Sequence, residues 1–322
     1  MLTYTNRPTI YEGVPTFLGV DAARSPADLA GADAAIIGVP YLTHLFGFDA
    51  DLTPRKIRQA SAKYSGGYLP ELDVDVLSTL RVVDYGDAHI DPADLPRSVE
   101  NVTAKVMEVL EAGALPITLG GSAPCSGYTL AAALSRFHGG KPIGAVNLDA
   151  HGDNREVWDG SSALGAVTWV RHQLQLPGFA PQHHMQIGMR GPGNPKANAD
   201  WFRAQGCGLY TAREMRKLSG GKLAPEVIRR AGDGTLGLWL GIDWDVLDIS
   251  VSPDWSYPEP LGMSAEEVLH LAFEVGKHGC LGFSTMSSPA HATSMHWIVI
   301  WTVLYLLAGV AVHQKKAEAS LE

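Results

Sequence analysis

The most regular feature of the chain is a series of short apolar runs separated by longer amphipathic stretches. Each run is apolar throughout rather than alternating, which is typical of strands in a parallel sheet that helices cover on both faces. The runs that predict strands are 34–39, 81–87, 115–121, 142–149, 185–191, 236–245 and 281–287. Their alternation with helical segments predicts an α/β protein, a three-layer α/β/α sandwich around a mainly parallel sheet.

Helical segments are predicted between these strands. The stretch 98–113 places apolar residues three or four positions apart and ends at a glycine, as expected of an amphipathic helix. Thr211 and Ser264 each precede a glutamate by three residues, which is the capping-box pattern of a helix start. Helices are therefore expected directly after both residues.

The composition suits one large core and argues against some partners. Apolar residues make up 46% of the 322 residues and charged residues 18%, and no repeat or low-complexity linker divides the chain. We expect a single domain over 1–322, with 1–33 as an N-terminal extension and 313–322 as a tail. The formal net charge of −9 argues against a nucleic-acid partner, because phosphate binding needs a basic face.

The number of cysteines and the apolar runs indicate where in the cell the protein is expected. Three cysteines without a Cys-x-x-Cys pair predict no disulfide framework and favour a cytoplasmic location. No basic segment followed by an apolar stretch marks the N-terminus, so no signal peptide is predicted. The uncharged run 297–312 is shorter than the roughly 20 residues that span a bilayer. We expect it to form a core helix or an oligomer contact and not a membrane segment.

Two predicted strands end in clusters of acids. Asp149, His151 and Asp153 follow the strand at 142–149, and Asp243 and Asp245 end the strand at 236–245. In extended backbone, residues two positions apart point to the same side. Ligands of parallel sheets bind beyond the carboxyl ends of the strands, so these side chains are expected to face one cavity.

Crowded carboxylates need protons or cations to neutralise them. An oxygen-rich set with one imidazole suits Mn²⁺, Ni²⁺ or Zn²⁺ better than copper. The alternative is that the acids are separate loop carboxylates that cap helices or accept hydrogen bonds from backbone amides. Two clusters, each behind a buried strand, favour a metal site.

The same residues carry a family resemblance. "DAHGD" at 149–153 and "IDWDVLD" at 242–248 resemble the metal motifs of the ureohydrolases, which include arginase, agmatinase, guanidinobutyrase and formiminoglutamase. Segments at 38–58, 116–121 and 257–268 resemble the family in the right order. The resemblance implies an eight-stranded parallel sheet, a trimer or hexamer, and metal-dependent attack of water on a guanidinium carbon to release urea.

The family's metal-binding pattern is incomplete in this chain. Where the family has Gly-Gly-Asp-His, the sequence has Ser122 in place of the aspartate and Ala123 in place of the metal-binding histidine. The resemblance therefore leaves one site with Asp149, Asp153 and Asp243 but no imidazole. The second site, which adds His151 and Asp245 to Asp149 and Asp243, is complete, so we expect one ion or none.

Two more family positions are altered. Leu164 stands where the family has a histidine that shuttles protons, and Met286 stands where it has a glutamate that holds the guanidinium. A thioether offers packing but no charge, and a buried cation without a carboxylate partner is strongly destabilised. No catalytic residue is assigned from the sequence.

Bulky residues replace the family's Gly/Thr-rich loop. Trp255 and Tyr257 are assigned with Met286 to the substrate pocket, where they either fill the pocket or form an aromatic wall for an alkylated guanidine. Packing of the loop alone is an equal alternative.

Three functions remain open. The favoured one is a non-catalytic or weakly catalytic subunit, a pseudoenzyme that pairs with a catalytic ureohydrolase paralogue in a hetero-oligomer; the chain resembles the degenerate subunit of the nickel-dependent metformin hydrolases of this family. The second is an active single-metal C–N hydrolase, either agmatinase- or guanidinase-like or an amidohydrolase, because Asp149, His151 and Asp243 resemble the one-metal site of the deacetylase branch of the superfamily. The third, a scaffold without metal, is disfavoured because uncompensated acids destabilise a fold.

Overall fold

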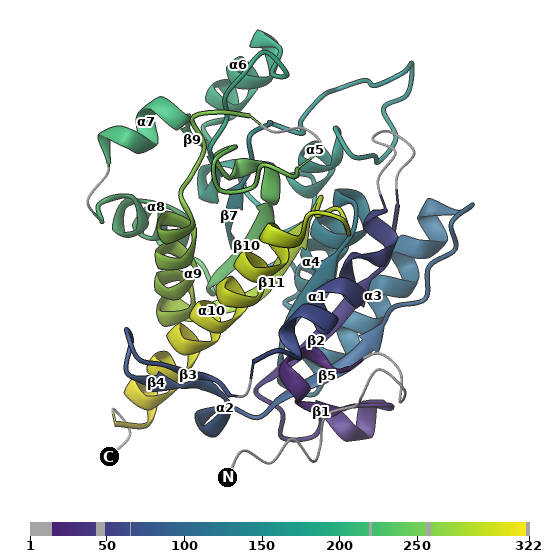
Figure 1. The fold of residues 1–322 in the computed structure, drawn as a ribbon. Coiled ribbons are helices and arrows are strands. Elements are labelled where there is room, and N and C mark those ends of the chain that lie inside the picture. Colours follow the sequence, from purple (N-terminus) through teal and green to yellow (C-terminus); the bar gives the residue numbers. More distant parts are fainter. Residues whose placement is uncertain (1–14, 43–48, 65, 219–220, 256–258, 320–322) are drawn as a thin grey trace.

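One parallel sheet dominates the fold. The computed structural model describes residues 15–42, 49–64, 66–218, 221–255 and 259–319. Within them, nine strands form a sheet in the order β1-β5-β2-β6-β11-β10-β7-β8-β9 (Figure 1). These strands are β1 (Asp21–Ala22), β2 (Ala34–Val39), β5 (Val82–Asp87), β6 (Leu115–Gly120), β7 (Gly144–Leu148), β8 (His184–Ile187), β9 (Gly208–Tyr210), β10 (Leu238–Asp243) and β11 (Cys280–Met286). A separate antiparallel pair joins β3 (Tyr68–Leu69) to β4 (Val74–Asp75).

The apolar runs of the sequence all become strands of this sheet. The predicted run 34–39 coincides with β2, and the other six differ from their strands by a few residues at the ends. The sheet has one strand more than the eight that the family resemblance implies, and both β1 and β9 lie outside the predicted runs. These two strands have two and three residues, which is too short to form a recognisable apolar run.

Helices cover both faces of the sheet. They are α1 (Thr53–Ser61), α2 (Val76–Thr79), α3 (Leu95–Glu111), α4 (Ala123–Phe137), α5 (Trp169–Gln173), α6 (Lys196–Gln205), α7 (Ala212–Lys217), α8 (Leu223–Gly232), α9 (Ala265–Gly279) and α10 (Thr293–Ala319). Apolar residues of α1, α8, α9 and α10 share one core cluster, and those of α3, α4, α5 and α6 share the other. The predicted three-layer sandwich is confirmed.

Successive side chains of a strand pack alternately into the two core clusters. In β2, Ala34 and Ile36 belong to the first cluster, whereas Ala35 and Ile37 belong to the second. A strand that is covered on both faces needs apolar side chains at every position. This explains why the strands appear in the sequence as continuous apolar runs.

The long helix α10 is part of the core. It is long and apolar enough to cross a membrane by length and composition, but 67% of its most apolar window is buried inside the protein. Figure 1 shows α10 (yellow) beside α9 (green). A Cβ on Gly276 would lie 2.2 Å from the Leu306 carbonyl oxygen, and one on Gly309 would lie 2.1 Å from that of Phe273. Two glycines therefore let these helices approach closely, as expected of a core helix.

Candidate metal centre

The register of two central strands brings the acidic clusters together. β10 pairs with β7 in parallel, with Ile242 opposite Leu148, so Asp243 and Asp149 lie next to each other at the carboxyl edge of the sheet. The Asp149 N–H donates to the Ile187 carbonyl at 2.9 Å, which continues the ladder one residue past β7. Asp149 is completely buried. Two carboxylates from distant parts of the chain are thus fixed by sheet hydrogen bonds.

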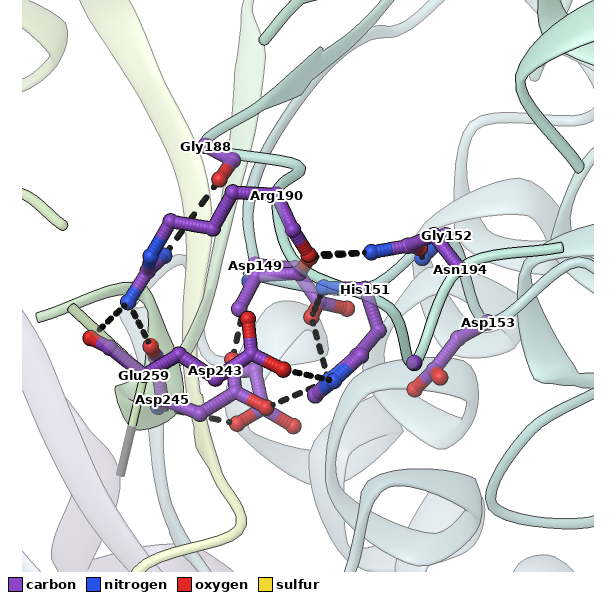
Figure 2. A network of polar contacts seen from close by, with 12 residues as sticks. Asp149, His151, Gly152, Asp153, Gly188, Arg190, Asn194, Asp243, Asp245 and Glu259 are labelled. Carbon is purple, nitrogen blue, oxygen red and sulfur yellow. Dashed lines mark hydrogen bonds and ion pairs between the residues drawn. The ribbon is translucent and has the colours of Figure 1, made fainter. Parts of the chain in front are cut away.

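Hydrogen bonds hold His151 between Asp149 and Asp245 (Figure 2). The His151 backbone N–H donates to Asp149 Oδ1 at 2.6 Å. Its ring Nδ1 lies 2.7 Å from Asp245 Oδ2 and 3.9 Å from Asp149 Oδ1. The Ala150 N–H donates to Asp245 Oδ1 at 2.9 Å. The Nδ1 side of the imidazole therefore faces two carboxylates at once.

The predicted ligands form two overlapping triads. Asp149, His151 and Asp245 form the first, which we call the histidine triad; Asp149, Asp153 and Asp243 form the second, the carboxylate triad. Within each triad, one candidate ligand atom from every residue lies within 4.8 Å of the others. The structure thus brings together all five residues that the sequence assigns to a metal site.

Burial and like charge raise most of the carboxyl pKa values. Burial, followed by the neighbouring aspartates, raises the pKa values of Asp149 and Asp243 well above the ordinary value. Burial raises the pKa of Asp153 to about 7. Burial alone would also raise the pKa of Asp245, but the charge and hydrogen bond of His151 outweigh it and lower that pKa. The cluster therefore holds more negative charge than its surroundings stabilise, and a cation would relieve this.

The histidine triad fits a divalent ion. Asp149 Oδ2 is buried and has no hydrogen-bond partner among the described residues, although buried carboxylate oxygens normally have one. Two carboxylates and one imidazole are ligands that Mn²⁺, Ni²⁺ and Zn²⁺ accept. We conclude that Asp149, His151 and Asp245 are suited to hold one such ion.

The carboxylate triad fits an ion less well. Trp169, the first residue of α5, donates its indole N–H to Asp153 Oδ2 at 2.9 Å. Asp153 has a left-handed backbone conformation with φ 44°, which aspartate tolerates better than most residues. Within the described part of the chain, no histidine joins this triad. One of its oxygens is thus already engaged, and its ligands are carboxylates alone.

The altered family positions lie around this edge of the sheet. Ser122 precedes α4 and Ala123 is its first residue, 2% exposed. Leu164 is half-buried and packs against the second core cluster. Met286 ends β11 and is completely buried; a Cβ on Gly127 would lie 2.4 Å from its sulfur atom. Met286 thus contributes to the core, and its neighbour Ser287 lines the pocket.

A pocket of about 170 Å³ opens in front of the two triads. Its lining includes four of the five predicted ligands, His151, Asp153, Asp243 and Asp245, together with Arg155, Trp158 and Trp255. The Arg155 guanidinium lies 4.7 Å from the centre of the Trp158 ring. Trp255 is 6% exposed and also packs in the first core cluster, whereas Tyr257 lies outside the described residues. The pocket thus combines acidic side chains with a cation and aromatic rings.

Several residues that the sequence does not single out support the metal ligands. Gln186 donates to the His151 carbonyl at 2.7 Å, and the Gly152 N–H donates to the Asn194 side chain at 3.1 Å. Arg190 donates to the carbonyls of Asp245 at 2.8 Å and of Glu259 at 3.0 Å (Figure 2). Glu259 approaches His151 Nε2 at 3.3 Å. Spacing does not mark these residues as supports of the ligands, although Glu259 lies in the family-like segment 257–268; tertiary packing places them there.

Comparison with known proteins gives consistent relatives. The sequence profile of the arginase family matches residues 32–295. Proclavaminate amidinohydrolase of Streptomyces clavuligerus is 29% identical over 87% of this chain and 87% of its own length. Guanidinobutyrase of Pseudomonas aeruginosa is 27% identical over 84% and 82%.

Solved structures agree with this family. The structure of the S. clavuligerus proclavaminate amidinohydrolase has a TM-score of 0.82 at 25% identity, and the match covers 95% of this chain and 99% of that one. The structure of Trypanosoma cruzi formiminoglutamase with Mn²⁺ has a TM-score of 0.80 at 24% identity over 92% and 98%. This protein belongs to the arginase family of metal-dependent hydrolases, whose members act on guanidino compounds.

Proposed function

We propose that this chain is a metal-binding subunit with little or no guanidine-hydrolysing activity of its own, and that it assembles with a catalytic paralogue in a trimer- or hexamer-based hetero-oligomer. The carboxylate triad carries the proposal. The family's second metal needs an imidazole at position 123, and Ala123 supplies a methyl group. The Trp169 indole occupies Asp153 Oδ2. A two-metal site therefore lacks its imidazole ligand, and one oxygen of Asp153 is already engaged in a hydrogen bond.

The substrate side of the site supports the same proposal. The described carboxylates that line the pocket are Asp153, Asp243 and Asp245, and all three belong to the triads. At the family's position for the carboxylate that holds the guanidinium, this chain has Met286, which is buried in the core. A guanidinium ion bound at that position would lose solvation without gaining a partner there, at a cost of ~3–5 kcal/mol.

The proton-transfer position supports it independently. Leu164 stands at the family's histidine and packs its side chain against the core. General acid–base groups commonly contribute 100-fold or more, roughly 10²–10⁴, to rate. The loss of a metal ligand, a proton carrier and a substrate carboxylate in one chain leaves little catalysis. In the assembled enzyme the intact paralogue would bind the guanidine-type substrate, with metformin as one candidate.

Urea release by separate and combined subunits tests this proposal. The chain purified alone should release no urea from guanidino compounds at any concentration of Mn²⁺ or Ni²⁺. Co-expression with an intact ureohydrolase from the same genome should give a stable mixed complex that is active. Full turnover by the chain alone would refute the proposal, and so would failure of every such paralogue to co-purify with it.

The intact histidine triad favours a second candidate, a hydrolase with one metal ion. A divalent ion held by Asp149, His151 and Asp245 would supply a water of lowered pKa and a Lewis acid. Arg155 would then pair with the carboxylate of a guanidino acid, the kind of compound after which guanidinobutyrase is named. One tightly bound ion per chain, with turnover that is lost in Asp245→Asn, would establish this candidate instead of the first.

A further inference from the structure

Both nitrogens of the His151 ring face carboxylates. Nδ1 lies 2.7 Å from Asp245 Oδ2, inside the histidine triad, and Nε2 lies 3.3 Å from Glu259 Oε1, outside it (Figure 2). An imidazole binds a metal through a nitrogen that carries no proton, so an ion bound to Nδ1 leaves the ring proton on Nε2. The carboxylate of Glu259 is positioned to accept that proton in a hydrogen bond.

Two glycines, Gly191 and Gly193, make room for the side chains of Glu259 and His151. A Cβ on Gly191 would lie 2.3 Å from Glu259 Oε2, and one on Gly193 would lie 2.9 Å from His151 Nε2. Side chains at either glycine would displace the carboxylate or the ring. Gly191 also has φ 74°, a conformation that favours glycine.

The backbone of Glu259 is anchored to the end of β10. The Arg190 guanidinium donates through Nη2 to the carbonyl oxygens of Asp245, Leu247 and Glu259, at 2.8, 2.9 and 3.0 Å. One cation thus ties the loop that carries Glu259 to the segment that carries the metal ligand Asp245. The side chain of Glu259 is 11% exposed, and its Oε2 is buried without a partner among the described residues.

A buried carboxylate with one oxygen unpaired destabilises the fold. A contribution to folding stability therefore does not explain why a glutamate stands at position 259. We propose that Glu259 is a positioning residue that keeps the proton of His151 on Nε2 and turns Nδ1 towards the metal ion. Carboxylates behind metal-binding histidines fix ring orientation and tautomer in this way, and their removal commonly lowers metal affinity by about 10–100-fold. The inference rests on the metal-binding part of the proposed function and is independent of whether the chain turns over a substrate.

Zinc titration of two Glu259 variants tests the inference. Glu259→Leu should weaken Zn²⁺ binding, measured by calorimetry, by about 10–100-fold. Glu259→Gln should retain most of the affinity, because its amide oxygen still accepts from Nε2. The same changes at Glu156, which follows the pocket residue Arg155 in the chain and whose side chain is 80% exposed, control for the loss of one negative charge.

Nitrogen NMR of the zinc-loaded, ¹⁵N-histidine-labelled protein separates positioning from general stability. Wild type and Glu259→Gln should show His151 bound through Nδ1 with a protonated Nε2, and Glu259→Leu should show a mixture of binding through both nitrogens. Equal affinity and an unchanged His151 spectrum in Glu259→Leu would overturn the inference. If wild type binds no Zn²⁺, Mn²⁺ or Ni²⁺, the proposed metal site fails first, and the inference fails with it.

Discussion

Asp153 makes the metal-free protein less stable above neutral pH. Burial raises its carboxyl pKa from the ordinary value of 3.8 to about 7 in the folded chain. Such a group favours folding at low pH and loses this contribution as the pH rises from 3.8 towards 7, because the unfolded chain releases the proton first. At about 1.4 kcal/mol for each tenfold change in the acid constant, the loss reaches about 4 kcal/mol above pH 7.

Asp153→Asn removes this charge with little other change. Asparagine tolerates the left-handed backbone at φ 44° as well as aspartate does, and its side-chain oxygen can accept the Trp169 indole N–H. In EDTA at pH 7.5 we expect the free energy of unfolding to rise by up to about 4 kcal/mol. At pH 4.5 we expect most of this gain to disappear, because the wild-type carboxyl is then protonated in the fold.

Urea denaturation followed by tryptophan fluorescence at pH 4.5, 6 and 7.5 measures the effect. Hydrogen bonds from Ser250 lower the pKa of Asp248 to about 2. Keeping the pH above 4 therefore preserves most of the stability that the charged Asp248 carboxylate contributes. Asp159→Asn is a matched control, since Asp159 is exposed and also left-handed, with φ 49°. A gain that is equal at all three pH values, or equal in the control, would refute the electrostatic argument.

Three further changes test other parts of the molecule. Mn²⁺ at one hundred times its Kd should raise the free energy of unfolding by about 2.7 kcal/mol, and Asp245→Asn should lose this gain in the same urea titration; an equal gain in the variant would contradict the histidine triad. Gly309→Ala should destabilise the protein by about 1–3 kcal/mol in thermal unfolding, because its Cβ would lie 2.1 Å from a carbonyl oxygen of α9; Gly66→Ala, where a Cβ meets nothing within 4 Å, should not, and equal effects would count against close helix packing. Under the second candidate function, a hydrolase with one metal ion, Arg155→Ala should weaken calorimetric binding of 4-guanidinobutyrate about tenfold, or about 1.4 kcal/mol, and leave agmatine binding unaffected; equal losses for both compounds would remove the role of Arg155 in carboxylate binding.

Much of the fold and the set of metal ligands can be predicted from the sequence, because the strands are buried on both faces and parallel strands end at one edge of the sheet. Strands buried on both faces must be apolar throughout, and this marks them in the sequence. Asp149 and Asp243 follow such strands, and parallel strands present their carboxyl ends at one edge. The convergence of the five predicted ligands thus follows from local pattern and one general rule.

The supporting residues depend on contacts that no local pattern encodes. His151 and Glu259 are 108 positions apart, and their contact exists because Arg190 anchors the intervening loops. Its place in a family motif predicts that Met286 lies in the substrate pocket. The structure ends β11 at Met286 and gives Ser287 a φ of 52°, so the chain turns there and Ser287 lines the pocket.

The missing histidine and the Trp169 hydrogen bond are physically linked. Because position 123 carries no imidazole, we expect no ion beside Asp153, and the Trp169 indole N–H donates to Asp153 Oδ2 instead. Ala123→His alone should therefore leave the chain with one ion, because Asp153 Oδ2 stays engaged. Ala123→His combined with Trp169→Phe frees this oxygen and should raise the metal content, measured by mass spectrometry of washed protein, towards two ions per chain. Two ions per chain in Ala123→His alone would show that Trp169 does not limit the second site, and the carboxylate triad would then differ from a complete site by the imidazole alone.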